Sequence, residues 1–269
     1  MLRVHKASGE LLLALSEEAC RELHVGPDPA VRELKRRLQG LCGQPRFRQR
    51  LLQGTVALEE DAGLTAPADL QLVLLPFSPA SAAELAALKT AAEADDVDAL
   101  EELLQLAKDV NLKVDRQGRA ALHLAASSGS LRAARLLLEA SATVDAANYT
   151  GSAPLLDAAR AGHVEVARAL LEARADKDRA NKGLNTPLSA AALGTSGTAA
   201  DMTRLLLEAR ADLRRACAGG QGPLHVACSH PSGLDVVRVF LQARVDIDRV
   251  DSSGRTALCV AAPWMLFLE

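Results

Sequence analysis

Aromatic residues are almost missing from this chain of 269 residues, which has four Phe, one Tyr and one Trp, or 2% of the total. Proteins that bind single-stranded nucleic acid usually stack its bases on aromatic side chains, so this composition argues against that class. Charge of one sign is not concentrated either. The formal net charge is -3 and like charges do not form long runs, so we expect neither a nucleic-acid partner nor binding to a membrane surface.

Cysteine is scarce and long hydrophobic runs are missing. The five Cys residues are odd in number and scattered, which favours a reducing compartment over a disulfide framework. The sequence shows no secretory leader and no run apolar enough to predict a membrane span. We therefore expect a cytoplasmic protein, with the nucleus as the alternative. The cysteines are Cys20, Cys42, Cys217, Cys228 and Cys259.

Alanine and leucine dominate instead, and hydrophobic residues make up 49% of the chain. The stretch from Ala142 to Asp178 shows how they are arranged. It predicts a turn, a short apolar helix that ends at Gly162, a second apolar helix, and then the turn again. Two such short helices bury little surface by themselves, so the unit is stable only if copies of it stack on one another.

Copies of this unit recur along the chain. Each first helix opens with a leucine in a box such as ALHLAA or PLLDAA, and second helices such as AARLLLEA and VARALLEA repeat too. The pattern resembles an ankyrin-repeat array, whose repeat of 33 residues is a turn followed by two helices. The resemblance implies an α-solenoid of about five and a half repeats over residues 84–262. The box leucines, spaced by 34, 33, 33, 36 and 34 residues, are Leu88, Leu122, Leu155, Leu188, Leu224 and Leu258.

The turns of the array carry short polar residues at equivalent positions, where a side chain can accept hydrogen bonds from the backbone just ahead. We expect these residues, Asp115, Asn148, Asn181 and Asp251, to be structural. After the second helix, where ankyrin repeats usually have Gly, three repeats carry arginine, which places the left-handed helix cap in doubt. These arginines are Arg174, Arg210 and Arg244.

Two places depart from the repeat pattern. The loop Gly194 to Asp201 makes the Leu188 unit longer and is expected to bulge from the stack. The last unit loses its second helix, because the pattern fails at Pro263 and an apolar tail follows over residues 263–269. For this tail we keep three readings: a truncated gene product, a cap over the open end of the stack, or a hydrophobic partner site.

Residues 1–77 predict a separate domain. Alternating residues in MLRVHK and ELLLALS predict a hairpin, PAVRELKRRLQGLCG predicts a helix, and RFRQRLLQG and DLQLVLLPF predict two further strands. This order resembles ubiquitin and implies a small α+β, ubiquitin-like β-grasp domain, with a linker over residues 78–83. The ubiquitin tail that permits conjugation is absent, so the resemblance implies a built-in docking module.

The resemblance to ubiquitin also marks a protein-binding patch. The positions that match ubiquitin's apolar recognition surface are Leu52, Gln71 and Val73, so the patch stays apolar but has lost its histidine. The alternative is that these are ordinary exposed sheet residues.

Candidates for catalysis and metal binding are weak. His225 and Cys228 lie three apart on one predicted helix, with His230 and Cys217 nearby, but no second ligand pair follows at zinc spacing. His225 falls at the box histidine of ankyrin repeats, which implies a structural bond to neighbouring backbone. The Gly219 to Gln221 turn and an acidic cluster over residues 93–102 also read as structural. We therefore expect no enzyme, no cofactor and no metal.

The turns of the array project like fingers and their tips are mostly basic. We predict that an acidic segment of a protein client lies along them with Tyr149 as its anchor, the alternative being a solvated rim of mixed charge. The chain is then a monomeric, non-enzymatic scaffold or adaptor, with a structural or inhibitory subunit of a larger complex as the other interpretation. The predicted tip residues are Arg116, Arg119, Tyr149, Lys177, Arg179, Lys182, Arg214, Arg215, Arg249 and Arg255.

Overall fold

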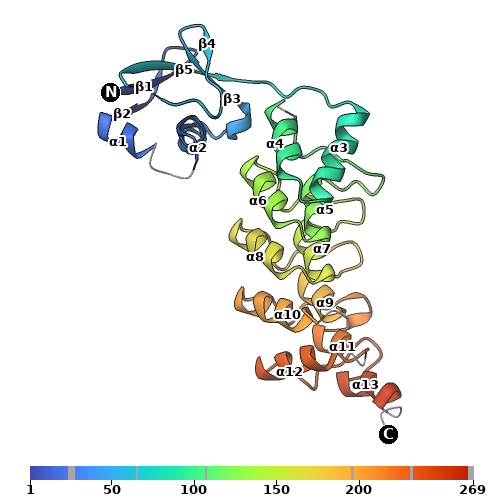
Figure 1. Ribbon diagram of the computed structural model, residues 1–269. Coiled ribbons are helices and arrows are strands. Elements are labelled where there is room, and N and C mark those ends of the chain that lie inside the picture. Colours follow the sequence, from blue (N-terminus) through green and yellow to red (C-terminus); the bar gives the residue numbers. More distant parts are fainter. Residues whose placement is uncertain (24–27, 65, 107, 195–196, 231–232, 266–269) are drawn as a thin grey trace. The chain divides into compact units, whose positions relative to one another are not determined.

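The structure is a computed structural model that describes residues 1–23, 28–64, 66–106, 108–194, 197–230 and 233–265 (Figure 1). It divides into two compact units. The first comprises residues 1–81 with the short segments Glu101–Val110 and Glu139–Ser141, and the second comprises the rest of the chain. Each unit is described by itself.

The first unit is built on a mixed sheet of five strands in the order β2-β1-β5-β3-β4. Strands β1 and β5 are parallel and the other neighbours are antiparallel, an arrangement that is β-grasp-like. The predicted hairpin, helix and last strand are confirmed. The strands are β1 (Leu2–Lys6), β2 (Leu11–Leu15), β3 (Gln49–Gln53), β4 (Val56–Ala57) and β5 (Ala68–Leu74).

Three local features differ from the sequence prediction. The segment expected as one strand, RFRQRLLQG, begins as the 3-10 turn η1 (Arg46–Arg48) before β3, because Pro45 precedes it and the side chains of Arg46 and Phe47 are both buried. Helix α1 (Glu17–Glu22) and strand β4 were not predicted, since both are too short for a clear hydrophobic period. Ser16 caps α1 by accepting a hydrogen bond from the N–H of Ala19 at 3.1 Å.

Helix α2 (Ala30–Cys42) covers one face of this sheet. Its apolar stripe is buried against the inner side chains of β1, β3 and β5, and Gly43 ends it with a left-handed φ of 67°. The alternation of each strand therefore leaves the other set of side chains on the opposite, more exposed face of the sheet. The core residues include Leu2, Val4, Val31, Leu34, Leu38, Leu51, Leu70 and Leu72.

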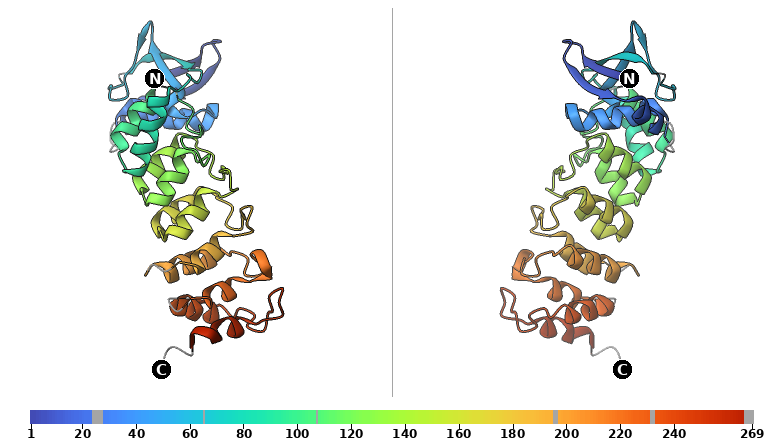
Figure 2. Two further views of the ribbon diagram at one scale, coloured as in Figure 1. Left: turned by 90° about the vertical axis from the view of Figure 1, so that its right-hand side faces the viewer. Right: turned by 90° about the vertical axis from the view of Figure 1, so that its left-hand side faces the viewer.

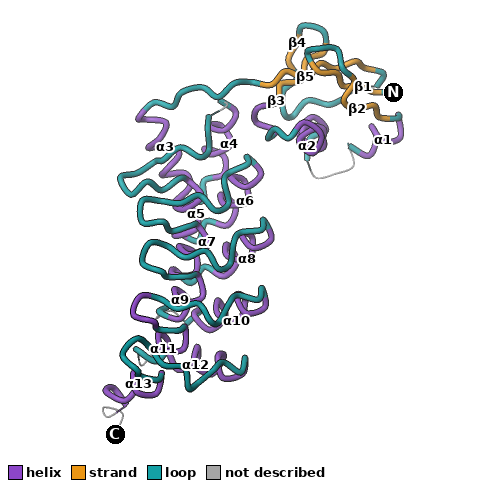
Figure 3. The backbone as a smooth tube through the Cα atoms, turned by 180° about the vertical axis from the view of Figure 1, so that it is seen from behind, coloured by secondary structure: helices purple, strands orange, loops and turns teal. Residues whose placement is uncertain are grey.

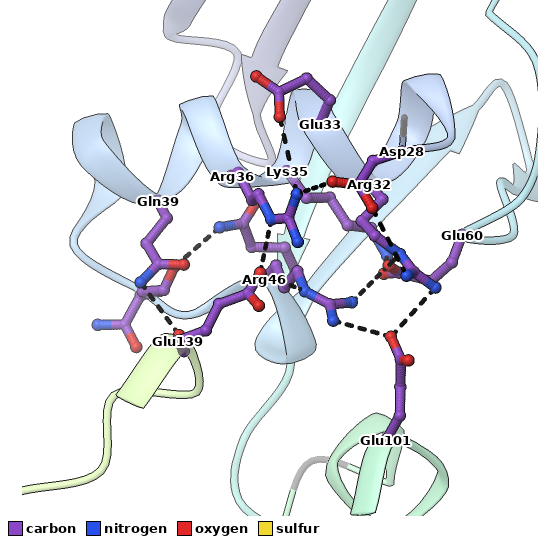
Figure 4. A network of polar contacts seen from close by, with 12 residues as sticks. Asp28, Arg32, Glu33, Lys35, Arg36, Gln39, Arg46, Glu60, Glu101 and Glu139 are labelled. Atoms are coloured by element: carbon purple, nitrogen blue, oxygen red, sulfur yellow. Dashed lines mark hydrogen bonds and ion pairs between the residues drawn. The ribbon is translucent and has the colours of Figure 1, made fainter. Parts of the chain in front are cut away.

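A network of charged side chains completes the first unit, with Arg46 at its centre (Figure 4). Arg46 is only 1% exposed and donates to three carboxylates, with distances of 2.7 Å to Glu60, 2.8 Å to Glu101 and 2.8 Å to Glu139. Arg36 shares Glu139 at 2.7 Å. Burial works to raise the pKa of Glu139, but the hydrogen bond from Arg36 and the charge of Arg46 outweigh it and lower that pKa.

The second unit consists of short helix pairs that succeed one another along the chain (Figure 2), with loops that join each pair to the next (Figure 3). The predicted repeat of turn and two helices is confirmed. Helices α4 and α6 end in residues that belong to the first unit. The helices are α3 (Ala82–Glu93), α4 (Val97–Gln105), α5 (Ala121–Ser128), α6 (Leu131–Glu139), α7 (Pro154–Ala161), α8 (Val164–Glu172), α9 (Pro187–Ala192), α10 (Ala199–Glu208), α11 (Pro223–Ala227), α12 (Leu234–Gln242) and α13 (Ala257–Met265), with the 3-10 turn η2 (Ala218–Gly220) before α11.

The box leucines show how the repeats are held together. Those from Leu88 to Leu224 are at most 6% exposed, and the alanine pairs beside them are buried too, so adjacent first helices approach closely around them. Leu258 differs, because it is 68% exposed. Among the described residues no second helix follows α13 to cover it, so the last box does not form a buried seam.

The departures from the repeat pattern have structural outcomes. Arg174, Arg210 and Arg244 keep the left-handed cap, with φ values of 66°, 63° and 54°, although glycine is absent.

The loop expected to bulge is partly helical, since α10 begins at Ala199, and residues 195–196 lie outside the described residues. Helix α13 continues past Pro263 to Met265, although a proline inside a helix removes one backbone hydrogen bond. The remaining tail, 266–269, is not described.

The segment predicted as a linker is held by hydrogen bonds. The Ser78 hydroxyl donates to the carbonyl of Leu106 at 2.9 Å, and Lys108 Nζ donates to the carbonyl of Pro79 at 2.7 Å. Both contacts lie inside the first unit, so residues 78 and 79 are an ordered part of that unit.

Candidate functional site

The finger turns of the array are built on one repeated hydrogen-bond motif. In each, a side-chain Oδ1 atom accepts from the backbone N–H groups two and four residues ahead, which closes the loop and orients its tip. The distances lie between 2.8 and 3.0 Å. The acceptors are the four residues expected to be structural, Asp115, Asn148, Asn181 and Asp251.

The box histidines contact the backbone of these finger turns. His123 Nε2 lies 3.1 Å from the carbonyl of Ser152, and His225 Nε2 lies 3.0 Å from the carbonyl of Arg255, so each box histidine contacts the finger of the next repeat. Burial lowers the pKa of His123, which favours the neutral imidazole that such a site needs. His225 therefore has a structural partner. Among the residues that the structure describes, no cluster of three or more His, Cys, Asp or Glu could hold a metal ion.

Two predicted tip residues are held by local ion pairs. Arg119 Nε donates to Asp115 at 2.6 Å, and Arg255 donates to Asp251 at 2.8 and 3.0 Å. Burial works to raise the pKa of Asp115, but hydrogen bonds from Arg119 outweigh it and lower that pKa. Hydrogen bonds from Arg255 lower the pKa of Asp251. Both arginines are thus already engaged in shaping their own turns.

Tyr149 is 56% exposed at its finger tip and also packs within the array. Its ring lies under the Lys113 ammonium, at 4.4 Å from Nζ to the centroid, and its N–H donates to the carbonyl of Gln117 at 2.9 Å. Gly118 has a φ of 71°, and a Cβ there would come within 2.6 Å of the ring. One face of the ring is therefore committed to contacts with the preceding finger.

The remaining tip cations are at the surface. Arg116, Lys182, Arg214 and Arg215 are exposed and form no ion pair with any residue in the described ranges. The other three are half-buried: Arg179 is unpaired among the described residues, Lys177 Nζ lies 3.7 Å from Asp178, and Arg249 donates to the carbonyl of Arg214 at 2.8 Å. Exposed or half-buried cations therefore recur at the tips of successive fingers along the array.

The sheet of the first unit brings the three predicted patch residues onto one face. Leu52 on β3 lies directly opposite Gln71 on β5, and Val73 is two residues further along β5, opposite Arg50. Their neighbours Leu51 and Leu72 point into the core instead. Leu52 and Val73 are half-buried and Gln71 is exposed, so the patch forms a continuous strip.

A fourth residue, His5, lies on this face and was not predicted as part of the patch. His5 on β1 pairs with Gln71 in the parallel ladder, so His5, Gln71 and Leu52 lie in one row across three strands. The alternation of LRVHK, with Leu2 and Val4 buried, could have placed His5 on the outer face. That His5 lies beside Gln71 could not be predicted, because the pairing joins residues more than sixty positions apart in the chain.

Comparison with protein families supports the array. Models described as ankyrin repeats match residues 88–181, as three copies, and residues 219–252. The unmatched interval between them contains α9 and α10, the helices of the lengthened repeat, so the ankyrin repeats run over residues 88–252. A comparison with curated proteins finds no relative with significant similarity. In the described part of the chain, no helix is both long and apolar enough to cross a membrane.

Proposed function

We propose that the chain is a non-enzymatic adaptor that holds a protein client on the finger tips of its ankyrin repeats and docks a second protein on the sheet face of its ubiquitin-like domain. Ankyrin repeats act generally in protein–protein interaction, and their stacked turns form an extended surface. The client segment is acidic, and it lies across the exposed cations of successive fingers.

One observation carries the array part of this proposal. Aspartates beside the tips accept backbone N–H bonds within or between the loops, whereas four tip cations are exposed and have no ion-pair partner in the described ranges: Arg116, Lys182, Arg214 and Arg215. Asp176, for example, accepts from the N–H of Asp178 at 3.0 Å, and Asp212 accepts from the N–H of Arg214 at 2.8 Å. The groups left to meet a partner are therefore mainly cationic, and they favour an acidic chain.

The sheet face supports the second site. Leu52 and Val73 supply apolar surface, while His5 and Arg50 border it with groups that can donate hydrogen bonds. An apolar strip with a polar border is the kind of surface that proteins use to bind one another.

The experiment compares capture of partners from living cells by proximity labelling. The full chain is compared with residues 1–77 alone and with a full chain in which Lys177, Arg179, Arg214 and Arg215 are changed to Glu. We expect the charge reversal to lower affinity for array-dependent clients at least tenfold, about 1.4 kcal/mol. The matched control places the same four charge reversals on second helices, at the exposed residues Arg135, Arg168, Arg204 and Arg238.

Two results would contradict the adaptor. Unchanged capture by the tip variant would remove the client site from the finger tips. Recovery of the chain in one fixed complex on size exclusion, instead of as a monomer with several separable partners, would favour a structural subunit. For the sheet face, Val73→Asp should remove the partners of the first domain, while Val56→Asp on the exposed strand β4 should leave them bound.

A further inference from the structure

Hydrogen bonds from side chains tie successive loops of the array together. In each of three loops a side-chain oxygen accepts the N–H of a residue more than thirty positions further along, in the following repeat, at 2.7 to 3.2 Å. Asp145 and Asp178 hold equivalent positions in the repeat, and Asn111 lies one position earlier. These bonds form a ladder along the loops that follow the second helices. Its rungs are Asn111 to Thr143, Asp145 to Asp176, and Asp178 to Asp212.

The ladder is interrupted at Arg214. In the repeat pattern Arg214 takes the place of Asp145 and Asp178, and Asp246 takes the place of Asp176 and Asp212. An arginine side chain has no acceptor, so in the part of the chain that the structure describes the N–H of Asp246 donates to no side-chain oxygen. In two earlier repeats a carboxylate accepts the hydrogen bond from the equivalent N–H, whereas the N–H of Asp246 has no such acceptor.

A basic cavity lies at this interruption. It has a volume of about 610 Å³, and three arginines are among the residues that line it. None of the three forms an ion pair with a residue in the described ranges, and Arg249 donates to the carbonyl of Arg214 at 2.8 Å. The one carboxylate present, that of Asp246, accepts the N–H of Asp248 at 3.1 Å. The lining residues are Leu213, Arg214, Arg244, Val245, Asp246 and Arg249.

Arg244 belongs to this cavity because of its backbone. It lies just after the end of α12 in the left-handed conformation, with a φ of 54°, and Arg174 and Arg210 do the same in the preceding repeats. The cap turns the chain so that its side chain lines the cavity beside Arg214 and Arg249. The ladder and the cavity are independent observations, and both indicate an anion.

We infer that this cavity binds a carboxylate side chain, Asp or Glu, of the acidic client segment. The inference rests on the proposed function and names the place where the client is anchored. The carboxylate takes the position that Asp145 and Asp178 fill from within the chain in earlier repeats, and it accepts the N–H of Asp246. Arginine binds carboxylates through two parallel hydrogen bonds, which adds direction to the contact.

The test uses the full chain and a fluorescein-labelled peptide of alternating Glu and Ser, with fluorescence anisotropy as the readout. Arg214→Asp restores the ladder and fills the site from within, so we expect peptide affinity to fall at least tenfold while Tm rises by about 2–4 °C. Arg244→Gln should lower affinity by about fivefold to tenfold without a change in Tm. Arg238→Gln, on the exposed face of α12, is the matched control and should bind like the parent chain.

The outcomes separate this inference from the function on which it rests. If the parent chain does not bind the peptide, the acidic client itself is wrong and the inference fails with it. If the parent chain binds but Arg214→Asp and Arg244→Gln bind equally well, only the anchor site is overturned. A phosphoserine peptide that binds more than tenfold tighter than the glutamate peptide would overturn the assignment to a carboxylate.

Discussion

At the scale of single residues, Asp157 is the clearest conflict with its surroundings. It lies on α7 at the position where other first helices carry Leu124, Ala190 and Val226, and it is 9% exposed. Its Oδ2 atom has no hydrogen-bond partner among the described residues. Burial raises the pKa of Asp157 to about 6, against the weaker opposing charges of Arg160 and Arg119. A charged group at this position therefore destabilises the folded chain.

The predicted effect of Asp157 depends on pH. Because its pKa is higher in the folded chain than the ordinary value of 3.8, the protonated group favours folding below pH 4, and this contribution is lost as pH rises through about 6. We expect Asp157→Leu to raise the free energy of unfolding at pH 7 by about 2 kcal/mol, and the gain to shrink below pH 5. Urea unfolding at both pH values measures it, with Asp157→Asn as the variant of equal volume. A gain that is equal at both values would contradict the titration.

The arginines at the helix caps give a second prediction at this scale. Arg174 and Arg210 have φ values of 66° and 63°, where a side chain with a Cβ costs roughly 1–2 kcal/mol relative to glycine. Glycine loses more chain entropy on folding, which offsets roughly half of that. We expect Arg174→Gly to stabilise the array by about 0.5–1 kcal/mol in urea unfolding. Arg168→Gly, inside α8, should destabilise by about 1 kcal/mol.

At the scale of elements, the finger turn is held by one side chain. Asn181 Oδ1 accepts from the N–H groups of Gly183 and Asn185 at 2.9 and 3.0 Å. We expect Asn181→Ala to cost about 1–2 kcal/mol, because two backbone donors lose their acceptor. Lys182→Ala, at the exposed neighbouring position, is the control and should change stability by less than about 0.5 kcal/mol. Equal effects of the two changes in thermal unfolding would show that the motif does not hold the turn.

The same elements explain how far the array could be predicted. The turn residues and the box leucines are local features, so Asp115, Asn148 and Leu122 could be assigned from spacing alone. The ladder could not be predicted, because it joins residues in adjacent repeats and its acceptors, two aspartates and one asparagine, look like ordinary loop residues. The interruption at Arg214 is meaningful only once Asp178 is known to bond the next loop.

At the scale of the whole molecule, Arg46 is the residue on which most of the polar structure of the first unit converges. Removing it takes away the one cation that Glu60, Glu101 and Glu139 share among the described residues, although Arg32 still contacts Glu101 and Arg36 still contacts Glu139. We expect Arg46→Ala to destabilise the first unit by about 3–5 kcal/mol. Hydrogen exchange of the β1 and β5 amides measures this effect. Arg50→Ala, at an exposed position on β3, is the control and should leave their protection unchanged.

The sequence by itself determined the repeat period, the turn residues, the buried leucines from Leu88 to Leu224, and the presence of a β-grasp-like segment ahead of the ankyrin repeats. These features depend on neighbours in the chain or on an exact recurrence, so pattern suffices. The tertiary structure alone decided the parallel pairing that places His5 beside Gln71, the three carboxylates around Arg46, and the open N–H of Asp246. Each of these depends on which distant segments pack together, because packing energy, and not local propensity, selects such contacts.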